Sequence, residues 1–333
     1  MTFSVSVVIP CHNEEENIEI LYSRLTEVLS AYPNHELLFV DDGSTDHTLD
    51  SIARLAENDN RIHYLSLSRN FGHQHALKAG LDHASGDCVI SLDADLQHPP
   101  ALIPALIARW QEGYEVVNTI RGAQKSLPLF KRITSHLFYK SINRLSSVEI
   151  NAGMADFRLL DRKVVDALKQ FNENYLFLRG LIPWLGFRQT SVAFEPAERN
   201  AGTTKYHFTR MLRLGLDGVT SFSSKPLYLS IAVGVLIAAV AFIYGLYAVY
   251  VHFFTGNALP GWTSITASVL FIGGLQLIML GITGIYLGKL FIENKRRPNY
   301  LISRKNFRWH DHVYLHRSVS LEGLIRLQFR TSG

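Results

Sequence analysis

Short apolar runs alternate with longer helical patterns over the first 119 residues. Strands are predicted at residues 5–9, 37–40, 62–65 and 88–92 and from residue 115, and helices at 14–30, after 46, up to 84 and at 100–113. Such alternation is typical of a parallel, doubly wound α/β sheet with helices on both faces. Ligands bind such sheets at the carboxyl ends of the strands. The pattern therefore predicts a site at one edge of the sheet.

Two long stretches near the C-terminus have no charged residue at all, at 227–251 and 262–288. With a rise of ~1.5 Å per residue, each helix would cross a hydrocarbon core ~30 Å thick. The short link between them contains Gly and Pro, and glycines 273, 274, 281, 284 and 288 give the second stretch a small-residue face for helix packing. We therefore expect a transmembrane hairpin at 226–289. It would follow a catalytic domain at 1–205 and an interfacial amphipathic helix at 206–225, and precede a basic tail at 290–333.

Charge gives the hairpin an orientation. Residues 289–333 hold ten basic and three acidic residues, a formal charge of +7, whereas the whole chain carries +4. Lys225 precedes the first span and a basic cluster follows the second, so the positive-inside rule places both ends in the cytoplasm, at an inner or plasma membrane. The N-terminus shows no secretory signal pattern. The two cysteines, Cys11 and Cys88, have no metal-ligand spacing, and no nucleic-acid recognition motif accompanies the basic excess.

A second basic segment precedes the hairpin. Residues 116–148 contain no acidic residue, and Arg132, His136, Lys140 and Arg144 recur every four positions with apolar residues between them. This spacing indicates a basic amphipathic helix lying on an anionic membrane surface. The alternative is an ordinary solvated helix face.

Polar residues are concentrated after three predicted strands, at 10–14, 41–44 and 93–95. Asp93 and Asp95 follow the apolar run 88–92 and could share one divalent cation with the phosphates of a substrate. The alternative is a pair of solvated aspartates in a turn. After the strand at 37–40, Gly43 would form a turn and Ser44 or Thr45 would cap the next helix. Asp41 and Asp42 would then remain to bind nucleotide hydroxyl or N–H groups. No G-x-G-x-x-G or Walker A motif is present, which disfavours dehydrogenases and P-loop enzymes.

An ordered set of motifs resembles glycosyltransferase family 2, most closely its polyprenyl-phosphate branch of dolichyl-phosphate mannose synthases and bactoprenol glucosyltransferases. The resemblance covers residues 4–305. Its motifs are Val8-Ile9-Pro10-x-x-Asn13-Glu14, the run from Val40 to Asp46, Arg69-Asn70-Phe71-Gly72, Asp93-Ala94-Asp95-Leu96-Gln97-x-Pro99, Asp156-Phe157-Arg158-Leu159-Leu160, Arg199-x-x-Gly202-x-x-Lys205 and Arg297-Pro298-x-Tyr300. Cys11-His12 departs from the residues that are usual before Asn-Glu.

The resemblance implies a GT-A fold and inverting transfer from a nucleotide-diphosphate sugar, most simply a UDP-sugar, to a polyprenyl phosphate such as undecaprenyl phosphate. It also implies Mg²⁺ or Mn²⁺, a homo-oligomer (a tetramer in related bacterial members) and a product used in cell-envelope glycan modification. The donor positions that match are Pro10, Asn13, Glu14, Asp41, Asp42, Asp93, Arg199 and Lys205, and the metal positions are Asp93, Asp95 and Gln97.

On the acceptor side, Asp156 matches a carboxylate credited as base or orienter. We favour the orienter, because a lipid phosphate, with a second pKa of ~6, needs little deprotonation. Arg121 and Arg132 are our candidates for that phosphate, since arginine binds phosphate bidentately, and Lys131 is the competing choice. His73, His75 and His98 are interpreted as polar residues at the pocket rim.

Two other functions are compatible with the family resemblance. A polysaccharide synthase would normally have more spans and a Gln-x-x-Arg-Trp motif, which the sequence lacks. A non-catalytic membrane scaffold would not need Asp93, Asp95 and Asp156 intact.

Overall fold

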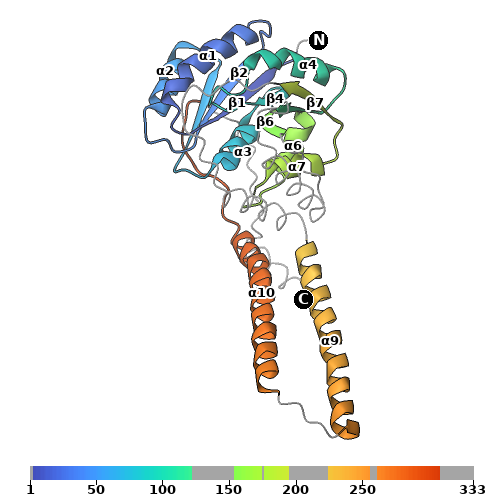
Figure 1. Ribbon diagram of the computed structural model, residues 1–333. Coiled ribbons are helices and arrows are strands. Elements are labelled where there is room, and N and C mark those ends of the chain that lie inside the picture. Colours follow the sequence, from blue (N-terminus) through green and yellow to red (C-terminus); the bar gives the residue numbers. More distant parts are fainter. Residues whose placement is uncertain (1–2, 122–153, 175, 195–223, 256–260, 308–333) are drawn as a thin grey trace, which may run out of the picture.

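A computed structural model describes residues 3–121, 154–174, 176–194, 224–255 and 261–307, and shows an α/β domain from which two long helices project (Figure 1). The eight strands are β1 (Val5–Cys11), β2 (His35–Asp41), β3 (Ile62–Leu67), β4 (Cys88–Ser91), β5 (Val116–Arg121), β6 (Met154–Asp161), β7 (Gln189–Phe194) and β8 (Ile302–Lys305). The helices are α1 (Glu15–Leu29), α2 (Thr48–Asn58), α3 (His73–His83), η1 (Pro100–Leu102), α4 (Ile103–Gln111), α6 (Arg162–Lys169), α7 (Leu178–Trp184), α9 (Lys225–Thr255) and α10 (Trp262–Asn294).

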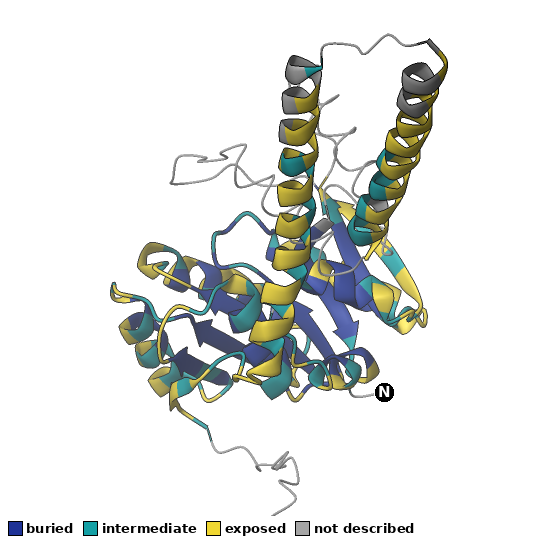
Figure 2. Ribbon diagram, turned by 90° about the horizontal axis from the view of Figure 1, so that it is seen from below, coloured by how far each residue is buried: buried dark blue, intermediate teal, exposed yellow. Residues whose placement is uncertain are grey.

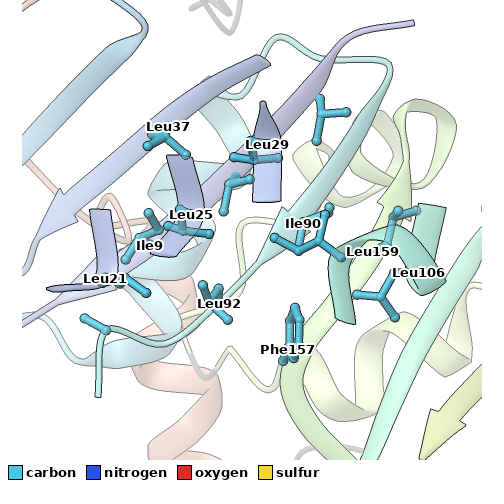
Figure 3. Close-up of a cluster of buried hydrophobic side chains, with 14 of the residues drawn as sticks. Ile9, Leu21, Leu25, Leu29, Leu37, Ile90, Leu92, Leu106, Phe157 and Leu159 are labelled. Atoms are coloured by element: carbon cyan, nitrogen blue, oxygen red, sulfur yellow. The ribbon is translucent and has the colours of Figure 1, made fainter. Parts of the chain in front are cut away.

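Both faces of the sheet are covered, as the alternating pattern predicts. Val7 and Ile9 belong to a buried cluster with residues of α1, α2 and α4, whereas Val8 belongs to a second cluster with residues of α3, α6 and α7. Figure 3 shows Ile9 of the first cluster with Leu21 and Leu25 of α1 and Leu106 of α4. Successive side chains of a strand point to opposite faces, so a strand buried on both sides is apolar throughout. This is why the central strands stand out in the sequence.

The strands that the alternating pattern predicts, β1 to β5, run in one direction, and the sheet is mixed because the later strands β6 and β8 run antiparallel to their neighbours. Its order is β7-β5-β6-β4-β1-β2-β3-β8, and β6 runs antiparallel to both β4 and β5. The first residues of β6 consequently lie at the edge where β4 and β5 end. The antiparallel direction thus brings Asp156 to the carboxyl edge of the parallel strands.

Residues 300–307 belong to the segment that the sequence predicts as a basic tail. These residues return to the α/β domain, where β8 pairs antiparallel with β3. The backbone N–H of Tyr64 donates to Asn306 Oδ1 (2.8 Å), and that of Ser68 donates to the Leu301 carbonyl (2.8 Å). In the sequence, α9 and α10 therefore stand between β7 and β8, two strands of the same sheet.

Tyr300 secures this returning segment to α3. Its hydroxyl donates to Asp82 Oδ2 (2.9 Å), while Asp82 Oδ1 accepts from Lys78 Nζ (2.5 Å), and Lys78 is only 1% exposed. We expect Tyr300→Phe to lower the free energy of unfolding by about 1 kcal/mol, because Asp82 loses one of its two donors. Thermal unfolding of the purified protein measures this. Tyr114→Phe, which keeps its ring beneath Arg188, is the control, and an equal shift in both variants would contradict the assignment.

α9 and α10 are long and apolar enough to cross a membrane, by length and composition, over Lys225–Tyr247 and Phe271–Asn294. The apolar side chains described on them are largely exposed (Figure 2), among them Leu236, Ile243 and Leu277. The predicted small-residue face is not packed in the single chain. Apart from the helix's own nearby backbone and the adjacent residues, no described atom lies within 4 Å of the position that a Cβ would take on Gly273, Gly274, Gly281, Gly284 or Gly288.

Candidate active site

The two aspartates of the Asp-Ala-Asp motif lie just beyond β4, at the carboxyl edge of the sheet. The backbone N–H of Leu92 still donates to the Val8 carbonyl (3.0 Å), so the sheet holds the chain up to the residue before Asp93. Asp95 Oδ1 accepts the backbone N–H of Gln97 (3.1 Å), which closes a tight turn in which Leu96 has a φ of +59°. The turn thus fixes the positions of both carboxylates.

Asp156 lies beside this turn in a fully formed ionic cluster. The side chain is 3% exposed and receives donors on both oxygens. Arg158 Nη2 lies 2.9 Å from Oδ1, and Arg179 binds in a fork, with Nε 3.0 Å from Oδ1 and Nη2 2.8 Å from Oδ2. Burial alone would raise the pKa of Asp156, but hydrogen bonds from His73 and Arg179 and the charges of both arginines hold it well below its usual range. Asp156 is therefore ionised at neutral pH and is a weak base.

His73 joins Asp156 to the Asp-Ala-Asp turn. Its Nε2 lies 3.5 Å from Asp93 Oδ1 and 3.5 Å from Asp156 Oδ2. Burial would lower the pKa of His73, but the hydrogen bond to Asp156 and the charge of Asp93 raise it above the ordinary value. A protonated imidazole at this point offsets the repulsion between the two carboxylates.

Asp93 has the electrostatic properties expected of a cation ligand. Burial raises its pKa, as do the charges of Asp156 and Asp95, while His73 and His98 oppose the shift. A divalent cation would relieve this cost. In the described part of the chain, no group of three or more His, Cys, Asp or Glu side chains is arranged as a protein-only metal site. The residues fit instead a Mg²⁺-type site with one or two carboxylates, completed by substrate phosphates.

The loops after β1 and β2 interlock at the same edge. Asn13, with a φ of +56°, receives the backbone N–H of Thr45 on its Oδ1 (2.8 Å) and donates its own backbone N–H to Ser44 Oγ (3.0 Å). Burial raises the pKa of Glu14, and the charges of Asp95 and Asp93 raise it further against a hydrogen bond from Asn17. Glu14 therefore lies within electrostatic reach of the Asp-Ala-Asp turn, and Pro10 precedes it in β1.

Asp41 and Asp42 are engaged by the protein itself. Asp41 accepts the backbone N–H of Ser44 and the Ser66 hydroxyl, and Asp42 accepts the backbone N–H groups of Phe71 and Gly72 at 2.7 and 2.9 Å. Both carboxylates thus hold the loops that surround the edge. The predicted helix cap is wrong, because the Asp46 side chain, not Ser44 or Thr45, accepts the first N–H of α2 from Thr48.

Gly43 is required where these loops meet. Its φ is +64°, and a Cβ at this position would lie 2.5 Å from the carbonyl carbon of Arg69. An L side chain would therefore be strained in its backbone and would collide with the loop after β3.

The acceptor side is described only in part. Arg121, at the end of β5, donates from Nη2 to Gln97 Oε1 (3.3 Å), so it lies beside the Asp-Ala-Asp turn. The other predicted cations, Lys131, Arg132, Arg199 and Lys205, lie outside the described residues, as do residues 206–223 of the interfacial helix predicted at 206–225.

Comparison with known proteins agrees with the geometry. Residues 6–169 match the protein family described as "Glycosyl transferase family 2". An uncharacterized glycosyltransferase of Bacillus subtilis is 42% identical over 300 residues, covering 90% of this chain and 93% of that protein. The chain belongs to glycosyltransferase family 2. It is a glycosyltransferase with a GT-A-like fold.

Relatives within this family include named enzymes. A prophage bactoprenol glucosyl transferase homolog of Escherichia coli is 42% identical over 302 residues, covering 90% of this chain and 98% of that protein. The bactoprenol glucosyl transferase of Shigella phage SfV is 40% identical, with the same coverage of both chains. The resemblance inferred from the motifs is thus confirmed.

No contact with Asp156 was predicted for four residues that the structure places against it: His73, Gln74, Arg158 and Arg179. Arg158 had a usable signal, since it lies two positions from Asp156 in a strand and therefore on the same face. His73 and Gln74 open the helix after β3, at the carboxyl edge of that strand, but nothing in their spacing indicates Asp156. Arg179 lies 23 residues from Asp156 in another element and has no local signal.

Proposed function

We propose that this glycosyltransferase moves a single hexose from a nucleotide-diphosphate sugar, most simply a UDP-sugar, to a polyprenyl phosphate such as undecaprenyl phosphate. One observation carries the choice of acceptor. The similarity to bactoprenol glucosyl transferases covers 90% of the chain. The unmatched tenth is shorter than α9 and α10 together, so the similarity extends into the helical hairpin as well as the catalytic domain. The product, a polyprenyl-phosphate monosaccharide, would serve cell-envelope glycan modification.

We place α9 and α10 in the membrane, with the catalytic domain on the cytoplasmic face. The return of the chain to β8 supports this topology, because both ends of the hairpin are then on the side of the catalytic domain. The basic residues around both ends support it through the positive-inside rule. Assembly as a homo-oligomer, a tetramer as in the family resemblance, is part of the proposal.

In the proposed reaction, a phosphate oxygen of the lipid attacks C1 of the sugar, and the nucleoside diphosphate leaves from the opposite face with inversion. Asp93, Asp95 and Gln97 would hold Mg²⁺ or Mn²⁺, which when bound offsets the charge of the leaving diphosphate. The loops that carry Pro10, Asn13, Glu14, Asp41 and Asp42 would form the nucleotide pocket, with Arg199 and Lys205 closing on the phosphates. Arg121 and Arg132 would bind the lipid phosphate.

Asp156 acts in this proposal as an orienting group rather than as a base. Its pKa is held well below the usual range, so its affinity for a proton is weak. A phosphate with a second pKa of ~6 is already anionic near neutral pH. The carboxylate instead orients the acceptor or a sugar hydroxyl.

The test is a transfer assay with the full chain in lipid nanodiscs, undecaprenyl phosphate, Mg²⁺ or Mn²⁺, and a panel of UDP- and GDP-sugars. The expected product is one glycolipid with a β-linked sugar from an α-linked donor, lost with a chelator and restored by the cation. Polymeric product would indicate a polysaccharide synthase. No glycolipid with any donor would overturn the proposal in favour of a scaffold.

A further inference from the structure

Glu293 is an exceptional residue in the helical hairpin. It is the sole acidic residue in the sequences of α9 and α10, and it stands in the last turn of α10. The C-terminal end of a helix carries partial negative charge, so a carboxylate is unfavourable there. A compensating contact is therefore expected.

That contact is made with the loop before α7. The backbone N–H of Asn174 donates to Glu293 Oε1 (2.7 Å), and its side-chain amide donates to Oε2 (3.3 Å). The two residues are 119 positions apart, and the contact is partly buried. Burial raises the pKa of the neighbouring Glu173, and the charge of Glu293 raises it further.

A short path leads from this contact to Asp156. α7 begins four residues after Asn174, and the backbone N–H of Leu178 donates to Gln74 Oε1 (3.1 Å). The next residue is Arg179, whose guanidinium grips both oxygens of Asp156. Leu178, Leu181 and Ile182 are buried, so α7 is packed against the domain and a shift at its start would move Arg179.

We propose that Glu293 is a positioning residue for the transfer reaction. Its hydrogen bonds with Asn174 connect the end of α10 to the loop before α7. They thereby fix the position of Arg179, and so of Asp156, relative to the hairpin. This inference rests on the proposed function, because it assigns a partner to Asp156 in that reaction. The hairpin would then fix the geometry of the acceptor side in addition to anchoring the enzyme.

The test compares variants of the full chain in nanodiscs with undecaprenyl phosphate and the donor that the wild type uses. Glu293→Ala is expected to lower kcat about tenfold and leave the KM for the nucleotide sugar within about twofold, since small displacements far from the chemistry are costly. Glu293→Gln keeps an acceptor oxygen for Asn174 and should retain most activity. Asp166→Asn, which removes an exposed carboxylate on α6 that pairs with Arg162 and Lys169, is the control and should match the wild type.

A double variant gives the decisive result. If Glu293 acts through Arg179, Glu293→Ala should cost nothing further in an Arg179→Gln background. A multiplicative loss in the double variant, or wild-type kcat in Glu293→Ala, would overturn the inference while the proposed function stood. If Glu293→Ala lowered the melting temperature and Glu293→Gln lost as much kcat as Glu293→Ala, the contact would be purely structural and the inference would be overturned. Absence of glycolipid with the wild type would overturn both.

Discussion

Asp95→Asn is expected to lower the rate of sugar transfer at least about 10³-fold while leaving the fold unchanged. Asparagine keeps the Oδ1 that accepts the backbone N–H of Gln97, so the turn after β4 persists. What is lost is the negative charge that would hold a divalent cation against the diphosphate. Initial rates of glycolipid formation would measure the loss of transfer, and calorimetric titration of Mn²⁺ in the presence of donor would measure the loss of cation binding.

Asp166→Asn is the matched control, because Asp166 is an exposed carboxylate on α6 that pairs with Arg162 and Lys169. It should leave transfer and cation binding unchanged. Full activity of Asp95→Asn at low cation concentration would contradict the metal assignment. An unchanged melting temperature is needed to attribute the loss to chemistry.

Much of the fold could be predicted from sequence because the central strands are apolar on both faces. β6 is different, since it carries Asp156 and Arg158 in its interior and both are buried. Buried charges in a strand look like loop residues until their partners are known. β8 is short and mostly exposed, so its pairing with β3 depends on a contact between residues more than 230 positions apart, such as Ser303 with Ser66.

The candidate site divides in the same way. Asp93, Asp95, Gln97 and Asp156 lie in short motifs that the sequence shows directly. Asp41 and Asp42 were correctly placed at the carboxyl edge of the sheet, but their backbone partners at Ser44, Phe71 and Gly72 come from the folding of two loops against each other. His73 and Arg179 are brought to Asp156 by tertiary structure alone. Motifs thus indicate the candidate site residues, whereas the groups that set the charge of those residues must be found in the structure.

Asp156→Asn is expected to reduce both activity and stability, and the two losses have different causes. An amide NH₂ in place of either oxygen would face the donors of Arg158, Arg179 and His73. Arg158 is fully buried, and its Nε and Nη1 have no hydrogen-bond partner among the described residues. Its charge is therefore balanced mainly by Asp156, and the substitution would remove that counter-charge. Breaking such a buried pair costs about 3–5 kcal/mol of unfolding free energy. Transfer should fall about 10²–10³-fold.

Arg179→Gln separates these effects, because the Arg179 side chain is 44% exposed and leaves the buried Asp156–Arg158 pair in place. Its melting temperature should fall less than that of Asp156→Asn, because Arg158 keeps its buried counter-charge. Its rate of transfer should still fall, because Asp156 loses the fork that fixes its direction. If Arg179→Gln transferred sugar at the wild-type rate, the loss in Asp156→Asn would be a consequence of unfolding. Asp156 would then be a structural counter-ion for Arg158, and the acceptor would have to be oriented by other groups.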